Sequence, residues 1–133
     1  MKKISKQIIS NYRKKLRLLI IQLEQKAGRS IYPNLLFQGS PTEIFRTCGN
    51  KKCKCAKGGT NRHGPYKVIQ VQSKGKQKQL VLRKGREGYY EMAKLYVWNI
   101  KNLQEVRNIF YEVDILLKEV INLRTIKEIE DGE

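Results

Sequence analysis

The chain has no long apolar segment, few acidic residues, one histidine and an odd number of cysteines. Behind the basic start MKKISKQ, the apolar run LLII ends at Gln22 and Glu24, and no small-residue cleavage site follows. This pattern argues against an export signal and against a membrane span. Three clustered cysteines cannot all pair with one another, and Cys53 and Cys55 are too close for an easy disulfide. We therefore expect a cytoplasmic protein with no membrane partner.

The shortage of acidic residues leaves a large positive charge. The 133 residues include 28 Lys and Arg against 12 Asp and Glu, which gives a formal net charge of +16, more than solubility asks of a chain this size. Residues 1–30 carry nine cations and one anion, residues 48–90 twelve and one, and residues 91–133 six and nine. The basic surface thus belongs to the start and the middle of the chain, and a polyanion is the first partner to consider.

Hydrophobic periodicity predicts a helix at each end of the chain. An amphipathic helix is expected over residues 5–26, because its apolar side chains recur at steps of three and four, with Gly28 as the stop. A long helix is expected over residues 90–127. Its apolar seam is formed by Leu103, Val106, Phe110, Val113, Leu117 and Val120. Three further residues flank the seam every seventh position, namely Ile109, Leu116 and Leu123.

Between the helices the sequence predicts short strands. Residues 43–47 are expected to form one strand, and residues 66–72 and 78–84 a β-hairpin with Gly75 in its turn. The predicted fold is therefore α+β in a single domain. Its expected segments are a basic helix (1–30), a metal loop with the β-hairpin (31–88), a long helix (89–128) and an acidic tail (129–133).

Two arrangements of the long helix stay open. It can pack against the first helix, with the hairpin over its early turns near Tyr96 and Trp98, or its uncovered length can pair with a second copy as a homodimer. The two are compatible, because a first helix of about 22 residues covers only part of one of about 38 residues.

The cysteines and the histidine form a metal-ligand pattern, Cys48-x4-Cys53-x-Cys55-x7-His63. Three thiolates and one imidazole are a set that tetrahedral zinc takes in structural sites. The alternative is that the cysteines are unrelated small apolar residues and that His63 is an ordinary loop histidine. Buried structural cysteines usually have apolar neighbours, whereas lysines surround these. The sequence therefore predicts one structural Zn²⁺.

Catalysis is not expected at this site. Four protein ligands leave no position for an activated water, and there is no second histidine to act as a base. If His63 were not a ligand, a three-cysteine site would resemble a deaminase centre, but the His-x-Glu element of that chemistry is absent.

The segment CGNKKCKC, followed by RHGPY, a hairpin and a helix with YVWNIKNLQEV, resembles a family of short prokaryotic proteins known as a domain of unknown function. The similarity covers about Gly39 to Leu123. The shared motif residues are Cys48, Gly49, Cys53, Cys55, His63, Gly64, Pro65 and Tyr66. Ile100 stands where an aromatic residue often follows the asparagine. The resemblance implies a zinc-bearing small protein often found with mobile genetic elements, and it implies no settled biochemistry.

Cationic side chains around the metal loop and the hairpin tip are candidate nucleic-acid contacts. They are Lys51, Lys52, Lys54, Lys57, Arg62, Lys67, Lys74, Lys76 and Lys78, with Arg13, Lys14 and Arg17 on the first helix. Isolated lysines at loop tips are usually only solvated, and the first helix could instead touch acidic lipid, although its apolar stripe is more typical of a core. Tyr89 and Tyr90 could stack on bases, but packing on the hairpin is the favoured interpretation.

These features predict a non-catalytic, zinc-containing nucleic-acid-binding protein that serves as an accessory subunit of a larger machine. The alternative is a zinc-stabilised adaptor that docks a protein partner through its long helix. No helix-turn-helix spacing and no zinc-finger helix indicates a sequence-specific reader.

Overall fold

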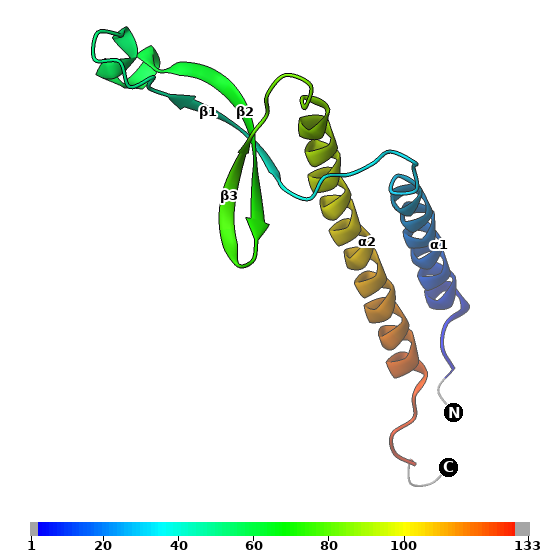
Figure 1. Ribbon diagram of the computed structural model, residues 1–133. Coiled ribbons are helices and arrows are strands. Elements are labelled where there is room, and N and C mark those ends of the chain that lie inside the picture. The colour runs from blue at the N-terminus through cyan, green and yellow to red at the C-terminus, as the bar shows by residue number, and fades with distance from the viewer. Residues whose placement is uncertain (1–2, 130–133) are drawn as a thin grey trace. The chain divides into compact units, whose positions relative to one another are not determined.

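The computed structural model describes residues 3–129 and has the predicted α+β fold. Its elements in chain order are α1 (Lys6–Gly28), β1 (Ser40–Arg46), the 3-10 turns η1 (Lys54–Lys57) and η2 (Gly59–Asn61), β2 (His63–Ser73), β3 (Lys76–Val81) and α2 (Gly88–Arg124) (Figure 1). Most of the predicted acidic tail lies outside the described residues. Across residues 3–129, no helix combines the length and apolar character needed to cross a membrane.

The chain divides into two compact units, and α2 contributes to both. The helical unit contains α1 and the part of α2 that begins at Lys101. The sheet unit, Pro33–Ile100, contains the three strands, the metal loop (residues 47–62) and the first turns of α2.

Helix α1 begins one residue later than predicted because Ser5 caps it. The Ser5 Oγ accepts a hydrogen bond from the Gln7 N–H at 3.2 Å, which satisfies one of the free amides of the first turn. The helix runs to Gly28, two residues beyond the prediction. Its predicted apolar stripe is half-buried, whereas none of its residues is fully buried.

Helices α1 and α2 run antiparallel in the helical unit and lie side by side (Figure 1). At one end the Asn102 Nδ2 donates to the Lys26 carbonyl oxygen and to the Ser30 Oγ, both at 2.7 Å. At the other end, Ile9 and Tyr12 line a hollow together with Val120. The predicted packing of the two helices is therefore confirmed.

The face of α2 that is buried follows a heptad spacing. Asn102, Ile109 and Leu116 are all buried and lie seven residues apart. The sequence predicted two of them only as flanks of the apolar seam. Because seven residues are close to two helical turns, these three side chains form one line along α2, and this line faces α1.

Helix α2 ends at Arg124, three residues before the predicted end. Its flanking apolar line stops at Leu123, and the β-branched residues Thr125 and Ile126 follow. Such residues lose side-chain freedom in a helix, so without apolar packing the helix gains little by continuing.

The sheet is antiparallel with strand order β1-β2-β3. The predicted hairpin is confirmed, with Ser73 paired to Lys76 across the two-residue turn Lys74-Gly75. Both turn residues have positive φ, 52° and 76°, as a type I′ turn requires. The predicted strand at 43–47 is instead Ser40–Arg46 and pairs along β2, so the sheet has three strands.

The core of the sheet unit forms around Ile69, Tyr90 and Ala93. Phe37, Val71, Leu80 and Leu82 pack around them. The sheet was predicted to cover α2 near Tyr96 and Trp98, but the contact lies earlier, and Trp98 is 44% exposed. The link between β3 and α2 is short, and this holds the sheet near the first turns of the helix. Tyr90 is thus a packing residue, as favoured from the sequence.

Candidate metal centre

The four predicted donors come from three neighbouring parts of the sheet unit. Cys48 follows β1, Cys53 caps the start of η1, Cys55 lies inside η1, and His63 is the first residue of β2. The sequence predicted that this strand begins at residue 66, after His63. As a strand residue it stands opposite Arg46 of β1, and this pairing closes the metal loop at its base.

The donor atoms converge on one point. The three Sγ atoms and one imidazole nitrogen all lie within 4.8 Å of one another. The Cys48 Sγ is 3.4 Å from the Cys55 Sγ, and the Cys53 Sγ is 3.3 Å from the His63 Nε2. The edges of a tetrahedral site with metal–ligand bonds of about 2.0–2.3 Å measure roughly 3.3–3.8 Å, so the four residues fit a single metal ion.

Local backbone geometry holds the donors in place. The Cys48 N–H donates to the Cys55 Sγ at 3.3 Å, which orients the buried thiol. The strand irregularity beside His63 requires a glycine, because Gly64 has a φ of 138° and an added Cβ would lie 2.7 Å from the Ile44 carbonyl oxygen. Pro65 also lies in this bulge, where a missing N–H interrupts no regular ladder.

The electrostatics of the cluster differ from thiol to thiol. The backbone N–H of Asn50, followed by hydrogen bonds from Cys55 and His63, lowers the pKa of Cys48 to about 6. The backbone N–H of Cys55 and then its thiol lower the pKa of Cys53. The backbone N–H of Cys48 lowers the pKa of Cys55, but burial and the two other thiols outweigh it and raise that pKa overall. Hydrogen bonds to Cys48 and Cys53 raise the pKa of His63.

Burial also differs across the cluster. Cys55 is fully buried, Cys53 is partly buried, and Cys48 and His63 are exposed. Cys55 is the only buried residue of the metal loop. A donor set with a single buried member can hold an ion at the surface, where it ties together a loop that has little apolar core.

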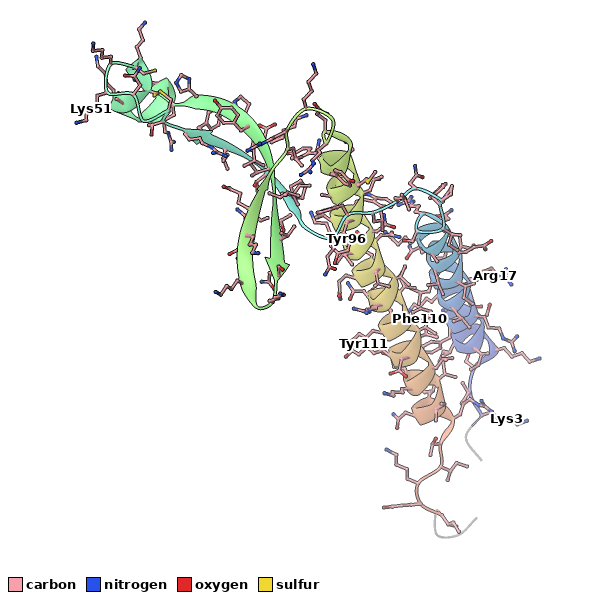
Figure 2. The ribbon with its side chains drawn as sticks, in the orientation of Figure 1. Lys3, Arg17, Lys51, Tyr96, Phe110 and Tyr111 are labelled. Carbon is pink, nitrogen blue, oxygen red and sulfur yellow. The ribbon has the colours of Figure 1, made fainter. Side chains whose placement is uncertain are left out.

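The cations of the sheet unit that the sequence singled out are all exposed. They are Lys51, Lys52, Lys54, Lys57 and Arg62 in the metal loop, Lys67 on β2, Lys74 in the hairpin turn, and Lys76 and Lys78 on β3. Lys51 projects outward from the loop (Figure 2). Two of these side chains have partners within the chain: the Lys67 Nζ lies 5.1 Å from the centre of the Tyr90 ring, and the Arg62 Nε donates to the Gly59 carbonyl oxygen.

Arg13, Lys14 and Arg17 lie exposed on α1, in the helical unit. Arg17 points away from the helix into solvent (Figure 2). These three residues share no element with the metal loop.

Arg46 is a residue of this region that the sequence analysis missed. It is exposed, it stands opposite His63, and its guanidinium carbon lies 5.5 Å from the centre of the Tyr66 ring. Residues 31–47 carry no net charge, so a count of charge by segment did not draw attention to Arg46. Its position two residues before Cys48 was the available signal.

Comparison with known proteins adds one finding. The family model of a domain of unknown function, DUF6788, matches residues 11–90. The chain belongs to the DUF6788 family. The family match contains all four donors, most of α1 and the whole sheet, and it ends where α2 begins. It thus starts earlier and ends earlier than the resemblance noted from the motif. No curated protein and no solved structure matches the chain.

Proposed function

We propose that this DUF6788 protein binds nucleic acid through a surface that a structural zinc ion holds in place, as an accessory subunit of a larger nucleic-acid machine. The observation that carries the proposal is that donor residues and exposed cations alternate along the metal loop. The donor atoms of Cys48, Cys53, Cys55 and His63 converge, while the lysines interleaved with them remain exposed.

The donor set favours zinc. Thiolate ligands select soft or borderline metals, and a tetrahedral set of three sulfurs and one imidazole is typical of structural zinc. The positive charge of the metal offsets the repulsion between neighbouring thiolates. Its bonds to the four donors stabilise a loop that has almost no apolar core. A reducing compartment such as the cytoplasm keeps the thiols free to bind it.

The closed donor set also favours a non-catalytic role. When all four residues bind the ion, the tetrahedral sphere has no position for water or substrate, so neither Lewis-acid nor hydroxide chemistry is available at the metal.

The charge of the sheet unit favours a polyanion. Residues 48–90 carry twelve cations against one anion. Most of the lysines lie in the metal loop and, at the opposite end of β2, on the hairpin tip, where β2 and β3 extend as two strands past the last β1 pair, Ser40 with Gln70. Each of these two groups of cations suits phosphates, and the two-stranded hairpin tip is narrow enough for the major groove of DNA. The motif resemblance implies an association with mobile elements, and an accessory subunit would suit that setting.

The test measures binding of labelled duplex and single-stranded nucleic acid by fluorescence anisotropy over a range of salt. A triple variant, Lys51→Gln with Lys52→Gln and Lys76→Gln, should weaken binding and reduce the slope of log K against log salt by up to about 2.7 if each lysine neutralises one phosphate.

The matched control removes three cations from the helical unit and its tail: Lys101, Lys118 and Lys127, each changed to Gln. It alters the net charge equally, and it should leave both affinity and slope near the wild-type values. If both variants lose affinity alike, binding follows net charge alone and the sheet unit is not the contact surface.

A protein adaptor is the second candidate, and the exposed apolar side chains of α2 favour it. Phe110 and Ile121 are more than half exposed. An adaptor should retain nucleic acid only weakly, without saturation and without loss in the triple variant, so the same titration separates the two functions.

A further inference from the structure

The apolar seam of α2 is only partly used inside the helical unit. Helix α1 packs on the buried line Asn102, Ile109 and Leu116, while the next residue in each case, Leu103, Phe110 and Leu117, is 42%, 57% and 44% exposed. Two adjacent lines with a spacing of seven residues are typical of a helix that packs against two other helices. Within the described part of the chain, only one of these neighbours is present.

The exposed line continues onto α1 as one face. Leu117 and Val120 line a hollow of about 440 Å³ together with Ile9, Tyr12 and Leu16 of α1. Arg13 and Arg124 also line it. We call this surface the open face and define it by Leu103, Phe110, Leu117 and Ile121 of α2 and by the hollow. Tyr111 points from α2 to the side away from α1 (Figure 2).

The open face is large enough for a stable interface. Its four residues on α2 lie between 42% and 61% exposed. With the half-buried residues around them they present roughly 500 Å² of apolar surface, which is in the upper part of the range of about 300–600 Å² for the largest patch on a monomer, and such patches often have a function. A standard interface buries about 800 Å² per partner, so a polar rim around this patch would complete one.

The distribution of charge indicates which helix the occupant presents. Helix α1 carries six cations and one anion, whereas α2 from Lys101 to Arg124 carries four of each. Contact between two α1 helices would bring strongly like-charged surfaces together. Contact between two copies of α2 involves no net charge on either side, so the open face suits the α2 of a second copy.

We propose that the open face is the interface of a homodimer in which α2 packs antiparallel against α2 of a second copy. A two-fold axis near Val113 and Asp114 would place Phe110 of each copy opposite Leu117 of the other. The exposed phenylalanine would then fill the hollow beside Leu117, and the same contact would occur twice, as isologous symmetry demands. This arrangement depends on neither the metal nor nucleic acid.

The first experiment measures the mass of the full chain by light scattering and sedimentation over a range of concentrations. The wild type should approach twice 15.6 kDa. Leu117→Gln should raise the dimer dissociation constant roughly 100-fold or more, because each dimer carries the change twice and an amide replaces a buried leucine.

The matched control is Ile115→Gln, two residues away on the same helix. Ile115 is 39% exposed, close to the value for Leu117, but it lines a different groove with Leu18 and Leu19. This variant should change the dissociation constant by less than about threefold. A dimer that resists Leu117→Gln, or that is lost only with Ile115→Gln, contradicts the proposed face.

A second measurement covers the case in which Leu117→Gln fails to fold. Metal-loaded Phe110→Cys and Leu117→Cys proteins are mixed under mild oxidation, and the crosslinked peptides are identified by mass spectrometry. The antiparallel dimer predicts a disulfide between Cys at 110 of one copy and Cys at 117 of the other, in excess over either self-pair. A wild type that stays monomeric at every concentration, or an excess of self-pairs, overturns the proposal.

Discussion

The metal loop and the helical unit differ in how much apolar surface they bury. The metal loop has four converging donors and a single buried residue, so it has chemistry to fix its shape but almost no core. The helical unit has more apolar surface than two helices can bury, since half-exposed residues line one side of α2. A chain of this size buries too little surface to stabilise both regions by apolar packing within one copy. In the two proposals above, one region therefore depends on an ion and the other on the helix of a second copy.

Removing the metal should produce the largest effect and should separate the two regions. Cys53→Ser, or treatment with a chelator, is expected to abolish metal binding and to disorder residues 47–62, because the ion supplies the order that the loop lacks. Amide signals of the loop in NMR spectra should collapse, whereas the helical circular dichroism at 222 nm should remain.

The control for this experiment is Ala56→Ser, an exposed loop position next to Cys55. It introduces the same hydroxyl without touching a donor, and metal content should stay at one ion per chain. An ordered loop in the metal-free Cys53→Ser protein would rule out a structural ion.

The second prediction concerns burial in the helical unit. Ile109→Ala removes a side chain that is 5% exposed on the buried line of α2, and the free energy of unfolding should fall by about 2–4 kcal/mol. Chemical denaturation at fixed protein concentration measures it. Ile126→Ala, beyond the end of α2, should cost less than about 0.5 kcal/mol. If Ile109→Ala and Ile126→Ala lowered the free energy of unfolding equally, α1 would not pack on this line.

Asn102 supplies the third prediction. It is buried, and its amide donates both to the end of α1 and to Ser30. Asn102→Ala should cost about 1–3 kcal/mol because the Lys26 carbonyl and the Ser30 hydroxyl lose their donor. Asn102→Asp should destabilise further as the pH rises and the carboxyl ionises, because a carboxylate cannot donate. A flat pH profile for the stability of Asn102→Asp would argue against this donation.

The smallest effect is expected from the ion pair between Lys26 and Glu105, whose charged atoms lie 2.6 Å apart at the surface. The Lys26 ammonium, as hydrogen-bond donor and as charge, lowers the pKa of Glu105. The contribution to stability is therefore present above the pKa of the unfolded carboxyl and is lost as the pH falls through the lower, folded value.

Glu105→Gln should slightly reduce the change in the free energy of unfolding with pH over this acidic range. The loss of stability at neutral pH should be smaller in high salt. Denaturation midpoints across the acidic range up to neutral pH measure it, with Glu24→Gln on α1 as the control. An unchanged profile in Glu105→Gln would mean that the ion pair contributes nothing to stability.

Repeating patterns made much of the fold predictable. The steps of three and four gave both helices to within three residues at each end, and Gly75 located the hairpin turn. The donor set was visible because cysteines that serve only as packing residues rarely lie among lysines. Each of these signals is local in the sequence.

Features that depend on contacts between residues far apart in the sequence were harder to predict. The pairing of β1 along β2 sets where β1 begins and makes His63 a strand residue, and neither fact appears in a local pattern. The periodicity likewise showed an apolar seam on α2 but did not indicate which line α1 would take. The line that packs on α1 includes Asn102, whose amide donates to the Lys26 carbonyl oxygen, and an apolar pattern passes over such a polar residue.

The pairing of Arg46 with His63 also affects the entropy of metal capture. The β1–β2 pairing brings both ends of the metal loop together, so a chain whose sheet has formed would not need to close that loop when it binds an ion. Binding then needs to order only the interior of a closed segment, which favours rapid reloading after metal loss. Changes in the length of residues 49–52, between the first two donors, should be tolerated for the same reason, since the anchored ends stay where the strands hold them.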